Sequence, residues 1–274
     1  LGVIMDTIKS IGLVGGGQMG EALVRGVIES GLVQAENIMV AEPFAERRQY
    51  LEATYRIRVT DKSGDLADSC NVVILAVKPQ IMDPVLAQYR DDLGADHLVI
   101  SIAAGVTLAQ LEKGLGKTMR IIRVMPNTPA LVLAGASALS GNGNISKKDM
   151  DIGQQIFSAV GTSVEVPENL LDAVTGLSGS GPGYVFTFIE AMIDGGVLAG
   201  IPRPIAEQLA IQTVYGSAKL ALESGEPAVV LKGRVTSPGG TTITGLQVLE
   251  EAGLRGTVMT AIEAAAERSR ELGE

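Results

Sequence analysis

The stretch IKSIGLVGGGQMGEALV occupies residues 8–24 and decides the fold of the first half of the chain. An apolar, β-rich run at residues 8–14 leads directly into the hexapeptide GGGQMG at residues 15–20. Apolar positions at helical spacing follow, beginning at Ala22. A strand, a G-x-G-x-x-G turn and a helix, in this order, form the fingerprint of a dinucleotide-binding turn. Alone, the glycine pattern is weak in a chain with 34 glycines, but the strand and helix around it make it specific.

Three glycines of the turn have separate structural roles. Gly15 permits the tight turn, Gly17 lets the backbone approach the pyrophosphate, and Gly20 lets the helix pack on the strand. Gln18 and Met19 open the helix, whose first turn offers unpaired N–H groups and a positive dipole end to the phosphates. We therefore expect the chain to bind a nicotinamide dinucleotide.

The rest of the first half alternates β-rich runs with amphipathic stretches, as βαβ units of a parallel sheet do. Strands are predicted at residues 7–14, 38–41, 72–77, 98–102, 119–125, 136–139 and 163–166, and helices at residues 18–29, 45–53, 83–89, 108–113 and 147–158. These elements predict a Rossmann-type, doubly wound α/β domain over residues 1–167.

After Pro167 the strand signals disappear and the apolar positions follow helical spacing. Helices are predicted at residues 169–177, 182–199, 204–224, 227–232, 239–251 and 254–272. Prolines near several predicted starts fit the first turn of a helix, where no N–H bond is lost. We expect an all-α domain at residues 168–274 with more apolar surface than one copy buries, and hence a homo-oligomer.

A carboxylate stands where the cofactor's ribose should lie. Glu42 follows the second predicted strand, 22 residues after Gly20, and a carboxylate there binds the adenosine ribose of NAD and repels the 2′-phosphate of NADP. The other interpretation is a solvated charge at a strand end. Arg47 and Arg48 lie on the next helix, and a guanidinium is a partner for a 2′-phosphate. The pattern favours NADH and leaves NADPH open.

Two later strand ends complete the expected cofactor site, because ligands of open α/β sheets bind at the carboxyl ends of the strands. The first carries Ala76, Val77, Lys78 and Pro79, and the second carries the small residues Ala103 and Ala104. Lys78 has a simpler interpretation as a surface lysine before a turn-forming proline.

The chain lacks the usual bases of alcohol oxidation. Its one histidine, His97, precedes a predicted strand and so lies opposite the ligand edge, where a structural or surface role fits better. The glycine-rich stretch at residues 176–186 holds no lysine. The lack of a suitably placed histidine or lysine favours a C=N substrate, because a protonated imine accepts hydride with little acid–base catalysis. One histidine and one cysteine also offer no metal site.

The segment TSPGGTT at residues 236–242 precedes an apolar helix. Amides of Gly240, Thr241 and Thr242, together with the Ser237 hydroxyl, are suited to hold a carboxylate, and the Thr242 hydroxyl is suited to meet a substrate nitrogen. An ordinary helix cap is the competing interpretation.

Composition limits the partners. With 31 acidic and 22 basic residues the net charge is −9, which disfavours nucleic acid. The longest apolar run, at residues 72–77, is far too short for a membrane helix. The N-terminus lacks a secretory signal and Cys70 is the only cysteine, so we expect a cytoplasmic protein. Met5 is a candidate start, with residues 1–4 an extension.

Six segments, in order and spacing, resemble the pyrroline-5-carboxylate reductase family across nearly the whole chain. They lie at residues 15–20, 76–79, 101–107, 125–129, 172–182 and 237–242, and the last, SPGGTT, is the most specific. The resemblance implies reduction of (S)-1-pyrroline-5-carboxylate to L-proline with NADH or NADPH, the last step of proline biosynthesis. It also implies a Rossmann domain followed by a helical dimerisation domain, with five dimers in a decamer.

The resemblance also assigns residues. Ser237 and the amides of Gly240, Thr241 and Thr242 would hold the substrate carboxylate, and Thr242 would hydrogen-bond the ring nitrogen. Thr175 would line the substrate pocket, Asn127 would lie near the nicotinamide, and Ser63 stands where relatives place an asparagine against the ribose. Gly233 departs from the family, in which an aspartate often follows the lysine matching Lys232.

Two alternatives remain at this level. One is a reductase of another cyclic imino acid, such as a six-membered piperideine carboxylate. The other is a sensor that binds NAD(H) without turnover, which the loop at residues 236–242 disfavours because a sensor has no use for a carboxylate cradle.

Overall fold

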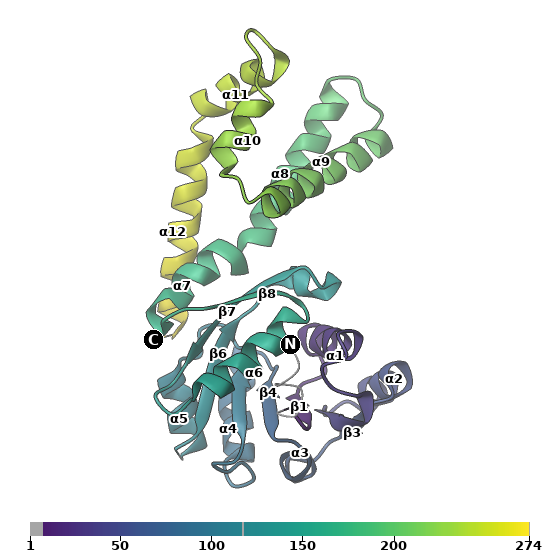
Figure 1. Ribbon diagram of the computed structural model, residues 1–274, viewed down its shortest axis with the longest axis vertical. Helices are drawn as coiled ribbons and strands as arrows, with labels where there is room; N and C mark the ends of the chain where they lie inside the picture. The colour runs from purple at the N-terminus through teal and green to yellow at the C-terminus, as the bar shows by residue number, and fades with distance from the viewer. Residues whose placement is uncertain (1–7, 117, 274) are drawn as a thin grey trace. The chain divides into compact units, whose positions relative to one another are not determined.

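The computed structural model describes residues 8–116 and 118–273 of the chain (Figure 1). The chain divides into two compact units, one of residues 1–180 with 264–274 and one of residues 181–263. The domain boundary expected near Pro167 stays a prediction, and the compact units divide further on, after Ser180. The candidate start at Met5 and the first residue of the strand predicted at 7–14 lie outside the described residues.

The first unit is built on one eight-stranded sheet of order β3-β2-β1-β4-β5-β6-β7-β8. All neighbouring strands are parallel except β6 and β7, which are antiparallel. The chain reverses its winding direction at β1, which pairs with β2 on one side and β4 on the other. Ligands of such sheets bind at this switch point. The strands are β1 Ile11–Val14, β2 Ile38–Ala41, β3 Arg58–Thr60, β4 Val72–Leu75, β5 Leu98–Ser101, β6 Arg120–Met125, β7 Gly135–Gly141 and β8 Gly161–Glu165.

Helices cover both faces of this sheet, because successive strand side chains point to opposite sides. Leu13 belongs to the apolar cluster that the strands form with α1 Gln18–Glu29, α2 Ala45–Tyr55 and α6 Lys147–Ser158. The neighbouring Val14 belongs to the second cluster, formed with α3 Ser63–Ser69, α4 Met82–Tyr89 and α5 Leu108–Leu115. The doubly wound fold is confirmed, and Cys70 is buried in the second cluster, where burial raises the pKa of its thiol to about 11.

Two elements, β3 and α3, were not predicted from the sequence. β3 has three residues and lies at the sheet edge, and its exposed first residue, Arg58, hides the apolar signal. α3 is only seven residues long, and its apolar positions are the buried pair Leu66 and Ala67. Elements this short carry too few periodic positions to be recognised. The 3₁₀ helices of this unit are η1 Ala35–Asn37, η2 Pro79–Ile81, η3 Thr128–Val132 and η4 Glu168–Leu170.

The helix predicted at residues 169–177 is three short pieces. They are η4, α7 Leu171–Val174 and a π-helical turn, η5 Thr175–Gly179. This segment is tied to its own unit by several polar contacts, two of which join side chains. The buried Arg123 of β6 donates to Glu168 at 3.0 Å, and the Ser269 hydroxyl donates to Asp172 at 2.6 Å. The connection is therefore fixed to the sheet and to the chain's last helix.

The second unit is helical, as predicted. It holds α8 Gly181–Leu198, α9 Arg203–Ser224, α10 Ala228–Arg234, α11 Thr241–Glu251 and the first part of α12 Leu254–Gly273. The helices α8 and α9 pack on each other (Figure 1), and the Tyr184 hydroxyl donates to the Ala261 carbonyl at 3.4 Å. Many large apolar side chains are exposed, among them Leu198 at 91% and Leu222 at 84%. None of the helices in the described ranges has the length and apolar content that crossing a bilayer requires.

Candidate functional site

The glycine turn has the shape that a dinucleotide needs. Gly15 has φ +102°, and a side chain there would meet the Ala76 carbonyl oxygen at 2.7 Å. A side chain at Gly20 would collide with the Gly15 carbonyl oxygen, whereas one at Gly17 would meet no atom within 4 Å. The turn is therefore closed by contact at Gly15 and Gly20 and open at Gly17, where a pyrophosphate would approach the backbone. These observations fit the predicted cofactor.

A hollow of about 610 Å³ lies beside this turn. It is lined from the ends of β1, β4, β5 and β6 by Gly17, Gln18, Met19, Ala76, Val77, Lys78, Ile102, Ala104, Met125, Pro126, Asn127 and Thr128, and by Gly179. Apolar side chains and backbone dominate its wall, which suits a flat nicotinamide ring.

Several predicted cofactor residues thus line one hollow, and others do not line it. Gly15 and Gly20 shape the turn, Pro79 begins η2, and Ala103 is buried. Four lining residues were not predicted as site residues: Ile102, Met125, Pro126 and Thr128. Their signal was available, because all four follow β5 or lie at or after the end of β6, at the edge where ligands bind.

Glu42 directly follows β2 and is only 7% exposed. One carboxylate oxygen accepts the Gly16 N–H at 2.9 Å, and the other accepts the Phe44 N–H at 3.1 Å. A carboxylate has about four acceptor positions, so these bonds fix its direction and leave capacity for a ribose hydroxyl. The Glu42 carboxylate is therefore buried and hydrogen-bonded to the glycine turn. It is not the solvated charge at a strand end that the sequence had left open.

Ser63 begins α3, after the edge strand β3. It is half-buried and does not line the 610 Å³ hollow. Among the described residues, no hydrogen bond joins Ser63 to the glycine turn. Its contact with the ribose stays a prediction.

Asn127 joins the sheet to the π-helical turn. Its side-chain oxygen accepts the Ala136 N–H at 2.8 Å, and its amide donates to the Ser178 carbonyl at 3.1 Å. Thr175 opens that turn, and its hydroxyl donates to the Leu171 carbonyl at 2.8 Å. A side chain at Gly179 would collide with Met125 and would lie within 4 Å of Thr175. Thr175 is therefore adjacent to Gly179, which lines the hollow, but does not line the hollow itself.

In the second unit, the TSPGGTT segment forms a tight loop before α11. Gly239 has φ +66°, which favours glycine, and Gly240 is the N-cap with extended backbone. The Gly240 N–H donates to the Ser237 carbonyl at 3.0 Å, so it is engaged within the loop. Binding of a substrate carboxylate by that amide stays a prediction. Thr241 and Thr242 are exposed in the first turn, where amides have no intrahelical partner.

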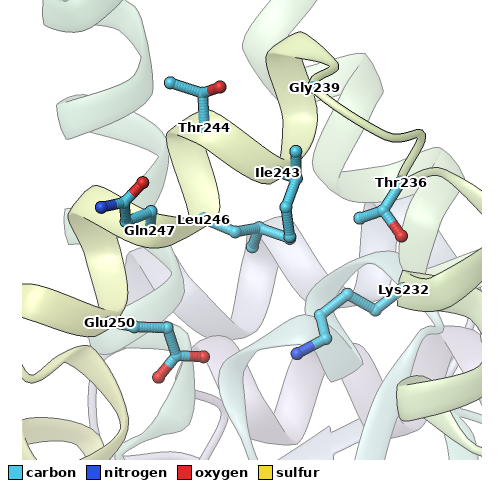
Figure 2. A pocket seen from close by; sticks show the side chains of 8 residues that line it. All are labelled: Lys232, Thr236, Gly239, Ile243, Thr244, Leu246, Gln247 and Glu250. Carbon is cyan, nitrogen blue, oxygen red and sulfur yellow. The ribbon is translucent and has the colours of Figure 1, made fainter.

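A second hollow, of about 430 Å³, adjoins this loop (Figure 2). Ile243 and Leu246 of α11 form an apolar wall, and Lys232 of α10 and Glu250 of α11 supply its charges. Thr236 and Gly239 belong to its lining, but Ser237, Gly240, Thr241 and Thr242 do not. A side chain at the neighbouring Gly233 would meet no atom within 4 Å, so the departure from the family at this position has no steric cause.

Two family models match separate parts of the chain. Residues 168–272 match the family model described as pyrroline-5-carboxylate reductase dimerisation. Residues 10–105 match the model described as NADP oxidoreductase, coenzyme F420-dependent.

Full-length relatives agree with the family-model matches. A pyrroline-5-carboxylate reductase of Synechocystis sp. is 50% identical over 265 residues, which are 96% of this chain and 98% of the relative. The structure of a pyrroline-5-carboxylate reductase from Coxiella burnetii has a TM-score of 0.94 at 37% identity, covering 98% of this chain and 100% of that one. A Plasmodium falciparum pyrroline carboxylate reductase with NADP bound has a TM-score of 0.86 at 36% identity, with the same coverage.

Proposed function

Because the chain belongs to the pyrroline-5-carboxylate reductase family, we infer that it reduces (S)-1-pyrroline-5-carboxylate to L-proline with NADH or NADPH. This reaction is the last step of proline biosynthesis. The observation that carries the assignment is the glycine turn, closed at Gly15 and Gly20 and open at Gly17, in a chain that is 50% identical to a full-length reductase.

The reaction needs few protein groups. A bound reduced nicotinamide would supply a hydride to the imine carbon, which is C2 of the pyrroline ring and becomes C5 of proline, and the protonated ring nitrogen becomes the amine of proline. The residues around the first hollow hold and orient the dinucleotide, with Asn127 beside the nicotinamide and Glu42 at the ribose. Ser63 is proposed as a further ribose contact. Orientation and exclusion of water are the protein's main contributions, because the iminium carbon already accepts hydride.

The substrate is held through its carboxylate. The amides of Thr241 and Thr242 and the Ser237 hydroxyl supply the donors, and the positive end of α11 favours an anion. The Thr242 hydroxyl hydrogen-bonds the ring nitrogen, and Thr175 lines the substrate pocket. Gly240 contributes by closing the loop, because a side chain there would collide with the Ser237 hydroxyl.

Purified protein should oxidise NADH or NADPH only when pyrroline-5-carboxylate is present, with proline as product. The six-membered piperideine carboxylate, assayed at equal concentration, should turn over more slowly. Cofactor binding without turnover of either imine would refute the assignment and revive the sensor alternative.

Thr242→Ala should lower kcat on the order of 10-fold, because one hydrogen bond to a charged group is lost. The cofactor affinity should stay unchanged. Thr257→Ala is the control, because Thr257 is also an exposed helical threonine, and its hydroxyl donates to the Gly253 carbonyl at 3.2 Å. An equal loss of turnover and cofactor affinity in Thr242→Ala would contradict the role.

The protein associates through its helical unit, which carries the dimerisation family match. The exposed apolar residues of this unit, such as Leu198 and Leu222, give a physical reason for association. We further propose dimers, five of which assemble into a decamer, in the cytoplasm and without nucleic-acid or membrane partners. Light scattering tests the assembly, and a monomeric mass would contradict it.

A further inference from the structure

The adenosine end of the dinucleotide site carries a fixed negative charge. Glu42 is held by the Gly16 and Phe44 N–H groups, so its carboxylate cannot swing away without breaking two hydrogen bonds in a 7% exposed position. In this fold the residue at the end of β2 meets the adenosine ribose. A 2′-phosphate would bring about −1.5 to −2 further charges next to this carboxylate.

Arg47 is a candidate to compensate for that charge, but the structure commits it elsewhere. Its Nε donates to the Gly16 carbonyl at 2.5 Å, and its guanidinium pairs with Glu21 of α1. The guanidinium also lies 4.9 Å from the centre of the Tyr50 ring. Its charge is therefore already balanced by a carboxylate.

Glu21 is itself held in place. It accepts hydrogen bonds from the Tyr50 hydroxyl at 2.9 Å and from the Tyr55 hydroxyl at 2.8 Å, besides its pair with Arg47. Burial would raise the pKa of Glu21, but hydrogen bonds from Arg47, Tyr55 and Tyr50 outweigh it and lower the pKa. Glu21 thus stays ionised at neutral pH and keeps Arg47 occupied.

Arg48 is engaged as well. One guanidinium nitrogen donates to the Glu42 carbonyl at 2.6 Å and to the Pro43 carbonyl at 2.9 Å, and the other pairs with Asp61 at 3.1 Å. Both arginines that left NADPH open at the level of sequence have carboxylate partners, and the carboxylate at the ribose has no cationic partner among the described residues.

We propose that this end of the site selects NADH over NADPH, with Glu42 as the specificity-determining residue and Glu21 as the positioning residue that withholds Arg47. The proposal rests on the proposed function, because it concerns the same dinucleotide site. One related reductase has been solved with NADP bound, so the preference of this chain is argued from its own residues. The selection lies in the four side chains Glu21, Glu42, Arg47 and Arg48.

The first test uses the unaltered protein. Titration followed by nicotinamide fluorescence should give a Kd for NADH at least about tenfold below that for NADPH, as expected for one uncompensated carboxylate–phosphate contact. Adenosine 5′-phosphate should likewise compete better than adenosine 2′,5′-bisphosphate. Equal or tighter binding of the 2′-phosphorylated member of either pair would overturn the proposal.

Variants then separate the two roles. Glu42→Gln removes the charge and keeps one acceptor oxygen for the two N–H groups of Gly16 and Phe44, so the ratio of the NADPH Kd to the NADH Kd should fall about tenfold. Glu21→Gln should tighten NADPH binding alone, by releasing Arg47, and adding Arg47→Ala should cancel that gain. Glu46→Gln, on the exposed surface of α2, is the charge-matched control and should leave the ratio unchanged.

The outcomes are distinguishable from a failure of the proposed function. Absence of turnover with both cofactors would refute the reductase assignment, while the ratio of the two Kd values would still report on selection. A Glu42→Gln protein that melts like the parent and keeps the parental ratio would overturn the role of Glu42. A Glu21→Gln protein with an unchanged ratio would overturn the role of Glu21.

Discussion

Replacing Gly17 by alanine separates binding from folding at the glycine turn. Gly17 is the N-cap of α1 with φ −68° and ψ −174°, which alanine adopts without strain, and a Cβ there would meet no atom within 4 Å. Alanine is a slightly poorer cap than glycine, by a few tenths of a kcal/mol or more, but it restricts the unfolded chain by about 0.4–1 kcal/mol. Stability should therefore stay within about 1 kcal/mol of the parent.

Cofactor binding should respond very differently. The new methyl group would occupy the open side of the turn, where we propose that the pyrophosphate meets the backbone. Loss of a single hydrogen bond to the charged phosphate, worth about 1.5–3 kcal/mol, raises the Kd by about 10- to 150-fold. We expect a loss of this size for NADH with a melting temperature within about 4 °C of the parent.

The assay pairs a nicotinamide fluorescence titration with a thermal melt of the same sample. Gly143→Ala is the control, because Gly143 also has open surroundings and ordinary backbone angles but lies away from the turn. A Kd for NADH within about twofold of the parent, in a normally folded Gly17→Ala protein, would refute the placement of the pyrophosphate at Gly17.

Three other features of the molecule can be tested by stability measurements. Gly20→Ala should lower the free energy of unfolding by about 1–3 kcal/mol in denaturant titrations, because its Cβ collides with the Gly15 carbonyl oxygen; unaltered stability would contradict this. The pKa of Glu21 is lowered, so its contribution to stability is present above its ordinary value of 4.5 and is lost as the pH falls through the folded-state pKa. Glu21→Gln should therefore flatten the loss of stability below about pH 5 in urea titrations, and an unchanged slope would refute the linkage. The unfolding midpoint should rise with protein concentration, because association stabilises the folded chain. A constant midpoint would argue against coupling between folding and association.

The sequence was most informative where chemistry imposes a backbone shape. A positive φ at Gly15 and a close approach at Gly20 admit only glycine, so the residue types alone reveal the turn. The partners of side chains were not accessible in this way. Nothing in the order of residues places Glu21 against Arg47, or the Gly240 N–H against the Ser237 carbonyl, because such pairs depend on how the turn and loop close. The missed strand β3 is likewise fixed by its pairing with β2, more than by its own three residues.

The two units differ in what their apolar residues do, although both follow regular periodicity. In the first unit they fill two clusters on the faces of the sheet. Among described residues 181–263 the buried apolar ones are only Ala206 and Ala210, while Ile205, Leu209 and Ile211 on the same helix α9 are at least half exposed. A helix that is apolar on most of its circumference is stable only when other helices cover it. We therefore expect association to stabilise the helices of the second unit, so that folding of this unit is coupled to assembly of the oligomer.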